Sequence, residues 1–428
     1  MGNRICLYYK YLIFIFLLLT LLFSGCTSIK KGIDRQLQNP ILQNSLHGLM
    51  VMDAKTQKIV YKNNSSLYFT PASNVKIATF YSGLKLLPKN IPSLKYLVAN
   101  DTLFVESTGD PTWLHPYFQD STSIKWLKKH NNICLYLKNS EETRYGPGWA
   151  WEDYDTYFSP EKGTLPLYGN VVTISTGDSL SVIPRFFQDS ISFIDDAPKR
   201  REEFNNRFYI NPSEKDTVEV PFITSPQLTK QLLESVLGKK ISTAHYLPEG
   251  EKKVLHGIET DSIYKQMLFE SDNFLAEQLM ITASSTISDT LSVHRAIAYM
   301  LENDLSNLEQ QPRWVDGSGL SRYNLFTPQS FVQILRKIYT ETPHERLFYL
   351  FPIWDASGTV EKWQDSTTEP FIFAKSGSLG NNYNLSGYVK TKSGKLLIFS
   401  FMNNHFKIPT SQIRSEIYIV LKKLYEDY

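Results

Sequence analysis

The stretch TPASNVKIAT, residues 70–79, carries a serine and a lysine three residues apart in an otherwise apolar segment. On a helix this spacing places Ser73 and Lys76 on one face, about one turn apart. A serine hydroxyl is a poor nucleophile until a base takes its proton, and a lysine kept neutral by burial or by other cations can be that base. The ordinary alternative is an exposed helix start with a solvated lysine. The same spacing recurs at Ser28/Lys31, Ser82/Lys85, Ser159/Lys162 and Ser262/Lys265.

The segment around this pair is predicted to be a buried helix. Pro71 before it and Pro88 after it limit the helix, which begins at about Ser73. Its interior is apolar on nearly every side, which is typical of a helix enclosed in a protein. Lys76 is therefore unusual, because a lysine in a buried helix needs a partner or a function.

Two further polar elements follow in the chain. Ser271-Asp-Asn273 interrupts the apolar pattern MLFESDNFLAEQLM, and its ordinary interpretation is a helix cap. Lys375-Ser376-Gly377, followed by Ser378, comes after the strand-like run FIFA. A similar triplet at 392–394 lies between two strand-like runs and is predicted to be a hairpin turn. The set S-x-x-K, S-D-N and K-T-G in this order is found in class A β-lactamases and penicillin-binding proteins.

With these elements the chain resembles the D-alanyl-D-alanine carboxypeptidase/endopeptidase family, the class C low-molecular-mass penicillin-binding proteins. The resemblance extends over roughly residues 45–405 and includes YFTPASNVKIAT, STGDPTW, PGWAWEDY, FESDNFLAEQL, WVDGSGLSRYNLFTP and AKSGSLGNNYNLSGYV. The long interval between Ser73 and Ser271 fits the inserted domains of this family rather than a class A β-lactamase. The third element is K-S-G instead of K-T-G, and serine keeps the hydroxyl.

The resemblance implies a role for each of these residues. Lys76 would take the proton of the nucleophile, and it is expected to be kept neutral by neighbouring cations, with serines and no acid around it. Backbone N–H groups would stabilise the oxyanion. The full set implied is Ser73 as the acylated nucleophile, Lys76 as its base, Ser271 and Asn273 in proton relay and amide binding, Lys375, Ser376, Gly377 and Ser378 at the terminal carboxylate, and the N–H groups of Ser73 and Ser378 as the oxyanion hole.

The remaining pattern predicts an α/β (α+β) fold of the serine β-lactamase/DD-peptidase type, with an antiparallel sheet flanked by helices. Strands are predicted within 48–63, 371–378, 384–391 and 395–404, and a last helix around 413–424. Short strand-like runs between turns predict a β-rich inserted domain over 95–227, in which Trp149 and Trp151 are expected in the core. The catalytic domain is then predicted to comprise 46–94 plus 228–428.

The first 25 residues have the layout of a secretory signal peptide. Arg4 and Lys10 precede an apolar run from about 11 to 23, and a small pair precedes Cys26. This resembles a bacterial lipoprotein cleavage site with a lipid on Cys26, and the alternative is an uncleaved anchor. Residues 26–45 would be the lipidated N-terminus and a polar linker. The residues after Cys26 contain no aspartate retention signal, which favours the outer membrane and a periplasmic location.

Charge and cysteine content exclude some functions. The formal net charge is +2, and loss of the signal peptide brings it near zero, which argues against a nucleic-acid partner. Cys134 would be the one thiol left after export and lipidation, so no intramolecular disulfide is expected. It is predicted to be a small buried residue.

The resemblance implies a serine-type D-Ala-D-Ala carboxypeptidase or endopeptidase that acts on peptidoglycan stem peptides and cross-links through a Ser73 acyl-enzyme. It implies β-lactams as covalent inhibitors, and no metal or organic cofactor. Two alternatives stay open. One is a non-catalytic muropeptide- or β-lactam-binding module, against which the complete set of motifs argues. The other is a serine β-lactamase or esterase, against which the long insert and the lack of an E-x-x-L-N motif argue.

Overall fold

The computed structural model describes residues 29–177, 179–354, 358 and 369–428. The chain divides into two compact units. The first unit comprises the chain up to Asn74 together with Leu325–Tyr428, and the second comprises Val75–Asn324. The division therefore falls inside the Ser73-x-x-Lys76 element. The predicted signal peptide, residues 1–25, and the predicted lipidation site Cys26 lie outside the described residues.

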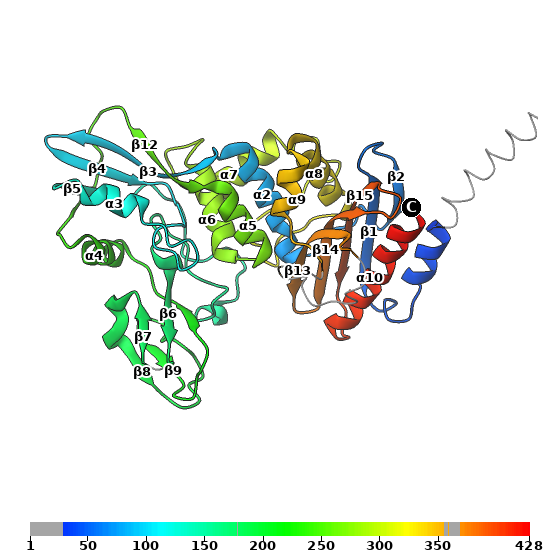
Figure 1. Ribbon diagram of the computed structural model, residues 1–428, viewed down its shortest axis with the longest axis horizontal. Helices are drawn as coiled ribbons and strands as arrows, with labels where there is room; N and C mark the ends of the chain where they lie inside the picture. The colour runs from blue at the N-terminus through cyan, green and yellow to red at the C-terminus, as the bar shows by residue number, and fades with distance from the viewer. Residues whose placement is uncertain (1–28, 178, 355–357, 359–368) are drawn as a thin grey trace, which may run out of the picture. The chain divides into compact units, whose positions relative to one another are not determined.

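The first unit is built on a five-stranded antiparallel sheet, drawn in blue and orange in Figure 1. The sheet confirms the strands predicted at both ends of the chain, and its central strands are buried on both faces at nearly every position. The 392–394 triplet forms the turn between the last two strands, as predicted, with the Gly394 N–H donating to Thr391 O at 2.9 Å. The strand order is β13 (Ile372–Leu379), β14 (Asn382–Lys390), β15 (Leu396–Asn404), β1 (Leu46–Asp53) and β2 (Ile59–Asn63).

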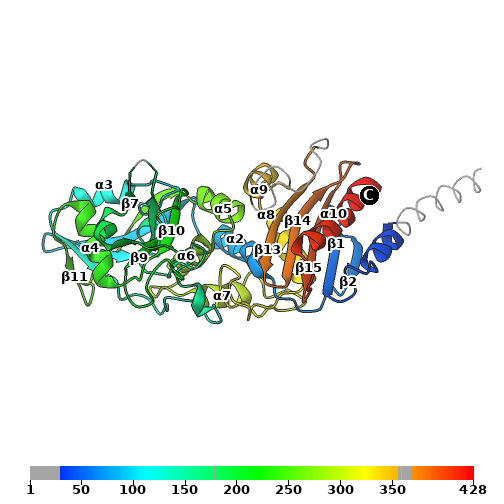
Figure 2. The ribbon, with the colours of Figure 1, turned by 90° about the horizontal axis from the view of Figure 1, so that it is seen from below.

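Helices cover both faces of this sheet (Figures 1 and 2). The last helix, α10 (Thr410–Asp427), buries an apolar stripe against β1, β14 and β15. On the other face, α8 (Pro328–Glu341) begins with a Thr327 cap and a proline in its first turn, and it is followed by α9 (His344–Leu350). The Tyr388 hydroxyl of β14 donates to the Leu335 carbonyl of α8 at 2.8 Å. These contacts fix the sheet between two helical layers.

The predicted linker is wrong over the described residues 29–45. Residues 29–37 are helical, and Ile29, Ile33 and Leu37, spaced by four, are buried in the same core as α10. The Asn39 amide donates to Glu416 of α10 at 3.1 Å. The many polar residues between the apolar positions hid a helical stripe of period four. Among the described residues, no helix has both the length and the apolarity that crossing a membrane requires.

The second unit contains a group of helices. The helix predicted from Ser73 begins as a short 3₁₀ turn, η1 (Ala72–Asn74), and continues as α2 into this unit. The apolar stretch 260–284 is interrupted at Ser271, as its polar residues indicated, so it forms two helices. The α6 helix is buried at nearly every position and packs against α2 and α7. The helices are α2 (Val75–Leu86), α5 (Thr260–Phe269), α6 (Asn273–Ser284) and α7 (Val293–Glu302).

The β-rich inserted region holds three small sheets, coloured cyan to green in Figure 1. The five-stranded sheet has the order β11 (Ser242–Thr243), β5 (Ile133–Tyr136), β4 (Thr102–Ser107), β3 (Asn90–Ala99), β12 (Lys253–Glu259). The others are β10 (Val218–Pro221), β6 (Val171–Ser175), β7 (Ser181–Ile183), and the pair β8 (Ile191–Phe193) and β9 (Phe208–Ile210). Two helices, α3 (Thr122–Lys128) and α4 (Pro226–Leu237), complete it.

Two expectations for this region differ from the structure. The region runs from β3 to β12, beyond the predicted limits of 95 and 227, because β12 pairs with β3 and α4 buries four leucines in the shared core. Trp151 was expected in the core but is 73% exposed, since it lies in a surface turn rather than in a strand. Cys134, in β5, is buried as predicted.

Candidate active site

In the first unit, Ser73 lies at the centre of the 3₁₀ turn that precedes α2. The preceding residue, Ala72, is buried with a φ of 50°, in the left-handed region that residues with a Cβ rarely adopt. Such a conformation costs about 1–3 kcal/mol and is kept where function or packing requires it. The next residue, Asn74, anchors the turn to the sheet, because its amide donates to Ser386 Oγ of β14 at 2.7 Å.

Gly377 allows this turn to lie directly on β13. A Cβ at Gly377 would be 2.5 Å from the Pro71 carbonyl oxygen and 2.7 Å from the Asn74 nitrogen. Both are backbone atoms of the Ser73 turn, and they cannot move aside as a flexible side chain could. The glycine of the K-S-G element is therefore required by close approach of two backbones, which also brings the turn and the K-S-G strand together within the first unit.

The K-S-G-S residues lie inside β13 and are paired along their whole length with β14, from Lys375↔Ser386 to Ser378↔Tyr383. Alternation along the strand places Lys375 and Gly377 on one face and the two serines on the other. Lys375 is fully buried, and its Nζ donates to the Ser376 carbonyl at 2.9 Å. Ser378 is exposed. The strand thus offers a buried cation and an accessible hydroxyl.

In the second unit, Lys76 is fully buried near the start of α2. Its Nζ donates to Asn273 Oδ1 at 2.6 Å and to the Ser318 carbonyl at 2.8 Å. The structure thus brings Lys76 and Asn273 together across 197 residues of sequence, as the motifs predicted.

Burial lowers the pKa of Lys76 from its ordinary value of 10.5 to about 8. The direction agrees with the prediction, and burial, one of the two expected causes, is confirmed. The expectation of neighbouring cations with no acid around Lys76 is wrong. The negative charges of Asp272, Asp316 and Glu277 raise the pKa of Lys76, so its surroundings are acidic rather than cationic. Removal from water outweighs these charges. The neutral form of Lys76 is therefore accessible slightly above neutral pH.

The S-D-N element forms the junction between α5 and α6. Asp272 caps α6, accepting the Leu275 N–H at 2.9 Å, so the element does contain a helix cap. Ser271, itself a predicted site residue, is half-buried with a φ of 58°, in the left-handed region. The Asn273 amide group is used on both sides, because its Nδ2 donates to the Phe158 carbonyl at 2.9 Å. The junction thus connects α2 with the inserted region.

The loop 314–324 supplies the carbonyl that accepts from Lys76. Asp316 organises the loop. Its carboxylate accepts four hydrogen bonds of 2.7–2.9 Å, from Gly319 N, Ser321 N, the Asn324 amide and the Trp149 indole N–H.

Gly317 permits close packing of the same loop on α6, since a Cβ there would lie 2.6 Å from the Ala276 carbonyl oxygen. The Thr79 hydroxyl of α2 donates to the Gly317 carbonyl at 2.6 Å. Asp316 and Gly317 thus have structural roles in shaping and placing this loop.

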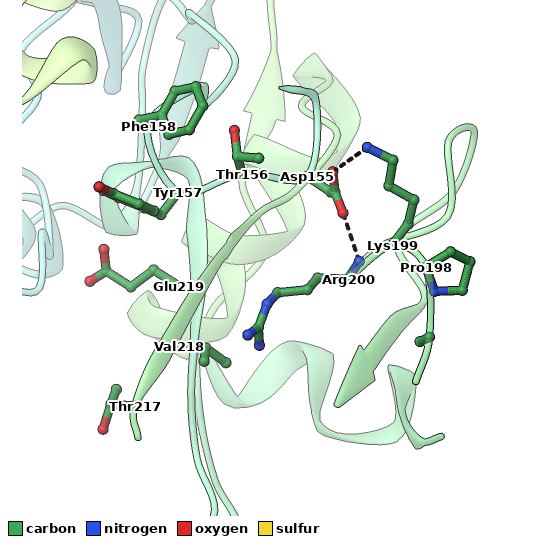
Figure 3. A pocket seen from close by; sticks show the side chains of 11 residues that line it. Asp155, Thr156, Tyr157, Phe158, Pro198, Lys199, Arg200, Thr217, Val218 and Glu219 are labelled. Carbon is green, nitrogen blue, oxygen red and sulfur yellow. Dashed lines mark hydrogen bonds and ion pairs between the residues drawn. The ribbon is translucent and has the colours of Figure 1, made fainter. Parts of the chain in front are cut away.

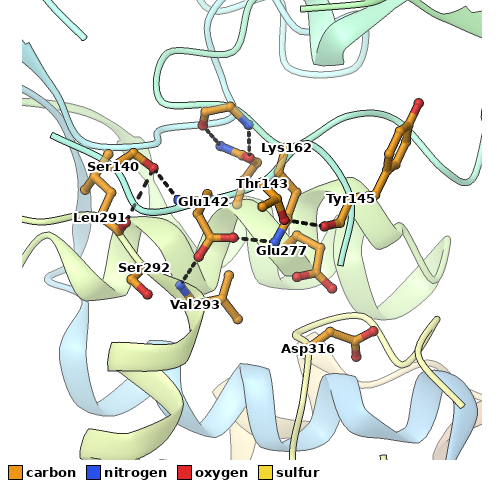
Figure 4. A network of polar contacts seen from close by, with 12 residues as sticks. Ser140, Glu142, Thr143, Tyr145, Lys162, Glu277, Leu291, Ser292, Val293 and Asp316 are labelled. Atoms are coloured by element: carbon orange, nitrogen blue, oxygen red, sulfur yellow. Dashed lines mark hydrogen bonds and ion pairs between the residues drawn. The ribbon is translucent and has the colours of Figure 1, made fainter. Parts of the chain in front are cut away.

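Glu277 was not identified from the sequence. It lies one helical turn after Asn273, is fully buried, and accepts the Ser318 N–H at 2.7 Å. Burial and the nearby charge of Asp316 raise the pKa of Glu277 to about 7, although the Lys162 ammonium opposes this. Lys162 itself forms an ion pair with Glu142. Figure 4 shows these side chains. An acidic residue in the apolar run NFLAEQLM was the available signal.

A cavity of about 680 Å³ lies in the inserted region beside the Phe158 segment. Figure 3 shows that its wall is charged: Lys199 Nζ and the Arg200 N–H both donate to Asp155, at 3.2 and 2.7 Å. Burial raises the pKa of Glu219, and the charge of Asp272 adds to this rise. The sequence offered no motif for this cavity.

Among the residues that the structure describes, no group of three or more His, Cys, Asp or Glu side chains is arranged to hold a metal ion.

Comparisons with known proteins identify relatives. The model of the D-Ala-D-Ala carboxypeptidase 3 (S13) family matches residues 29–181 and 239–424, which is well over half of the chain. The chain is 30% identical over 138 residues to penicillin-sensitive carboxypeptidase A of Dictyostelium discoideum and 34% identical over 94 residues to D-alanyl-D-alanine carboxypeptidase DacB of Haemophilus influenzae. These alignments cover 31% and 21% of this chain and only 26% and 20% of those relatives.

The fold is that of a solved relative. The crystal structure of penicillin-binding protein 4 from Haemophilus influenzae matches with a TM-score of 0.72 and 18% sequence identity, covering 92% of this chain and 99% of that chain. At this identity the match demonstrates a common fold, which confirms the predicted fold class. The family model leaves residues 182–238 unmatched, and part of the cavity wall, including Lys199 and Glu219, comes from this stretch.

Proposed function

We propose that this chain, which belongs to the D-Ala-D-Ala carboxypeptidase 3 (S13) family, is a serine DD-peptidase that cleaves D-Ala-D-Ala ends or D-Ala-containing cross-links of peptidoglycan. The observation that carries the proposal is the state of Lys76. A fully buried lysine, held by Asn273 and the Ser318 carbonyl and with a pKa lowered to about 8, is suited to accept a proton from Ser73, three residues before it. A lysine whose pKa is strongly lowered by burial is a functional-site candidate.

The proposed acylation step forms one bond and breaks one. Ser73 Oγ attacks the carbonyl carbon of the penultimate D-Ala while Lys76 takes the hydroxyl proton. The N–H groups of Ser73 and Ser378 stabilise the oxyanion, an effect worth about 2.7–4 kcal/mol for each donor removed. The C–N bond then breaks, and the departing D-Ala amine receives the proton held by Lys76 through the Ser271 hydroxyl, while Asn273 holds the substrate amide. Water hydrolyses the Ser73 ester, which releases the shortened peptide and restores the serine hydroxyl.

The terminal carboxylate of the substrate is assigned to β13. β13 is an edge strand, so a carboxylate beside its outer edge can be reached by Lys375 from one face and by Ser376 and Ser378 from the other. Gly377 contributes by letting the Ser73 turn approach β13. Because a β-lactam carries a carboxylate next to a strained amide, the same groups would accept it and Ser73 would be acylated.

The proposal is tested by intact-mass spectrometry of the full chain after incubation with benzylpenicillin. The expected result is one stable adduct with the mass of the drug on the wild type and none on Ser73→Ala. Intact penicillin with no adduct would indicate a non-catalytic binding module. Penicillin consumed without an adduct would indicate a β-lactamase. Release of D-alanine from a D-Ala-D-Ala peptide then distinguishes a peptidase from an acylated but inactive protein.

The charged cavity is assigned to the side chain of the stem peptide. Its wall adjoins Phe158, whose carbonyl accepts from Asn273, and it contains a carboxylate, Glu219, and the cations of Lys199 and Arg200. Groups of both signs suit a side chain that ends in an ammonium and a carboxylate. The two cations already pair with Asp155 and Glu214, at 3.2 and 2.9 Å. Glu219 has no ion-pair partner among the described residues and is therefore the group assigned to the ammonium.

Substitution of Glu219→Gln is expected to raise the KM for a peptide with an amino-terminated side chain about two- to fivefold, the range for a solvent-exposed ion pair. The kcat should change little, because Glu219 is assigned to the side chain of the substrate and takes no part in making or breaking bonds. N-acetyl-D-Ala-D-Ala, which has no such side chain, is the control substrate and should show no change. Equal effects on both substrates would contradict the assignment of the cavity.

Lipidation of Cys26 and attachment to the periplasmic face of the outer membrane are part of the same proposal. They are supported by the charged start, apolar run and small pair before Cys26. Labelled palmitate should be incorporated into the full chain but not into Cys26→Ala, and incorporation into both would contradict this assignment.

A further inference from the structure

The α6 helix holds Lys76 at two points. Asn273 and Glu277 are four residues apart and therefore lie on one face of the helix. Asn273 Oδ1 accepts directly from Lys76 Nζ at 2.6 Å. Glu277 acts through Ser318: its Oε1 accepts the Ser318 N–H at 2.7 Å, and the carbonyl of the same residue accepts from Lys76 Nζ at 2.8 Å. Glu277 thus holds the backbone of Ser318, which in turn holds Lys76.

The carboxyl group of Glu277 is only partly satisfied. It is fully buried, and its Oε2 has no hydrogen-bond partner among the residues that the structure describes. An ionised carboxylate with an unpaired oxygen is costly in such a place. Burial accordingly raises the pKa of Glu277 to about 7, so both charge states are populated near neutral pH.

Charged groups from the neighbouring elements face Glu277 and Lys76. Asp316 comes from the loop 314–324, Lys162 from the segment before β6, and Asp272 from the cap of α6. Asp316 accepts four hydrogen bonds and Asp272 caps the helix, whereas one oxygen of Glu277 accepts none from the described residues. Figure 4 shows Lys162 and Asp316 near Glu277, and the ion pair between Lys162 and Glu142. Glu277 is therefore the acidic neighbour whose charge is free to change.

We propose that Glu277 is a positioning residue for the peptidase reaction: its carboxyl group holds Ser318 against Lys76. This inference rests on the proposed role of Lys76 as the base. The negative charge of an ionised Glu277 raises the pKa of Lys76. Glu277 ionises at a lower pH than Lys76 loses its proton, so the negative charge of Glu277 opposes formation of the reactive, neutral Lys76.

The test is the rate of acylation of the full chain by benzylpenicillin between about pH 6 and pH 10. The wild-type rate is expected to rise with pH, with a midpoint near the Lys76 pKa of about 8. Glu277→Gln keeps an acceptor for the Ser318 N–H but removes the charge, so its midpoint should move down by about one pH unit with the plateau rate retained. Glu277→Ala removes the acceptor as well and should lower the plateau rate. The control is Glu302→Gln, an exposed residue at the end of α7, which should have the wild-type profile.

A Glu277→Gln midpoint equal to the wild-type value, or above it, would overturn the inference. A second readout needs no variant: one glutamate carboxyl carbon of the ¹³C-labelled wild type should titrate near pH 7 and shift again as Lys76 titrates. Absence of such a resonance would also overturn it. A wild type that is not acylated at any pH would refute the proposed function instead, and the carbon titration would still decide whether Glu277 and Lys76 are coupled.

Discussion

Replacement of Lys76 by methionine is expected to lower the rate constant for acylation of Ser73 by benzylpenicillin about 10²- to 10⁴-fold, the range for loss of a general base. Methionine fills a similar volume but cannot accept a proton. The thermal midpoint of unfolding should change much less than the rate. The reason is that the substitution removes the cost of burying an ammonium while it leaves Asn273 Oδ1 and the Ser318 carbonyl without this donor.

The same helix offers a matched control. Ser82 and Lys85 repeat the S-x-x-K spacing on α2, but Lys85 is partly exposed and pairs with Asp304 at 3.1 Å. Lys85→Met should therefore acylate at the wild-type rate. Stopped-flow or mass-resolved acylation kinetics measure both variants. A Lys76→Met chain that reacts as fast as the wild type would show that another group takes the serine proton.

Substitution of Gly377→Ala is expected to cause the second large effect. The added methyl carbon would lie 2.5 Å from the Pro71 carbonyl oxygen and 2.7 Å from the Asn74 nitrogen, so the turn that carries Ser73 must move away from β13. A displacement of about 1 Å at a reacting group costs about 100-fold in rate. Overpacking of this kind also destabilises a protein by about 1–3 kcal/mol. Both the acylation rate and the thermal midpoint should fall.

Gly177→Ala is the control for this substitution. Apart from the chain neighbours of Gly177, no atom of the described residues lies within 4 Å of the position of a Cβ there, and its φ is not in the left-handed region. It should change neither the rate nor the midpoint. If Gly377→Ala behaved like Gly177→Ala, the close approach of the Ser73 turn to β13 would not matter for reactivity.

Several elements could be predicted because their signals are local. The apolar runs at both ends of the chain produce the strands of the five-stranded sheet, and the turn at Gly394 follows from its polar residues between two strands. The three motifs identified residues that the fold does bring together in two sets. Ser73 and the K-S-G strand share the first unit, and Lys76 and Asn273 share the second.

Other elements could not be predicted from local pattern. The polar composition of residues 29–45 indicated a linker, yet Ile33 and Leu37 pack with α10 from the other end of the chain. The limits of the inserted region depend on β12 pairing with β3, more than 150 residues earlier. Trp151 is exposed because a surface turn, and not a strand, carries it.

The sequence by itself determined which residues are able to perform the chemistry, since the types and order of the three motifs are covalent facts. Only the tertiary structure decided what surrounds Lys76. Its surroundings combine burial with three acidic residues, of which Glu277 and Asp316 lie about 200 and 240 residues away along the chain. A pKa depends on the balance between desolvation and the charges that folding brings near, and neither quantity is encoded within one turn of helix.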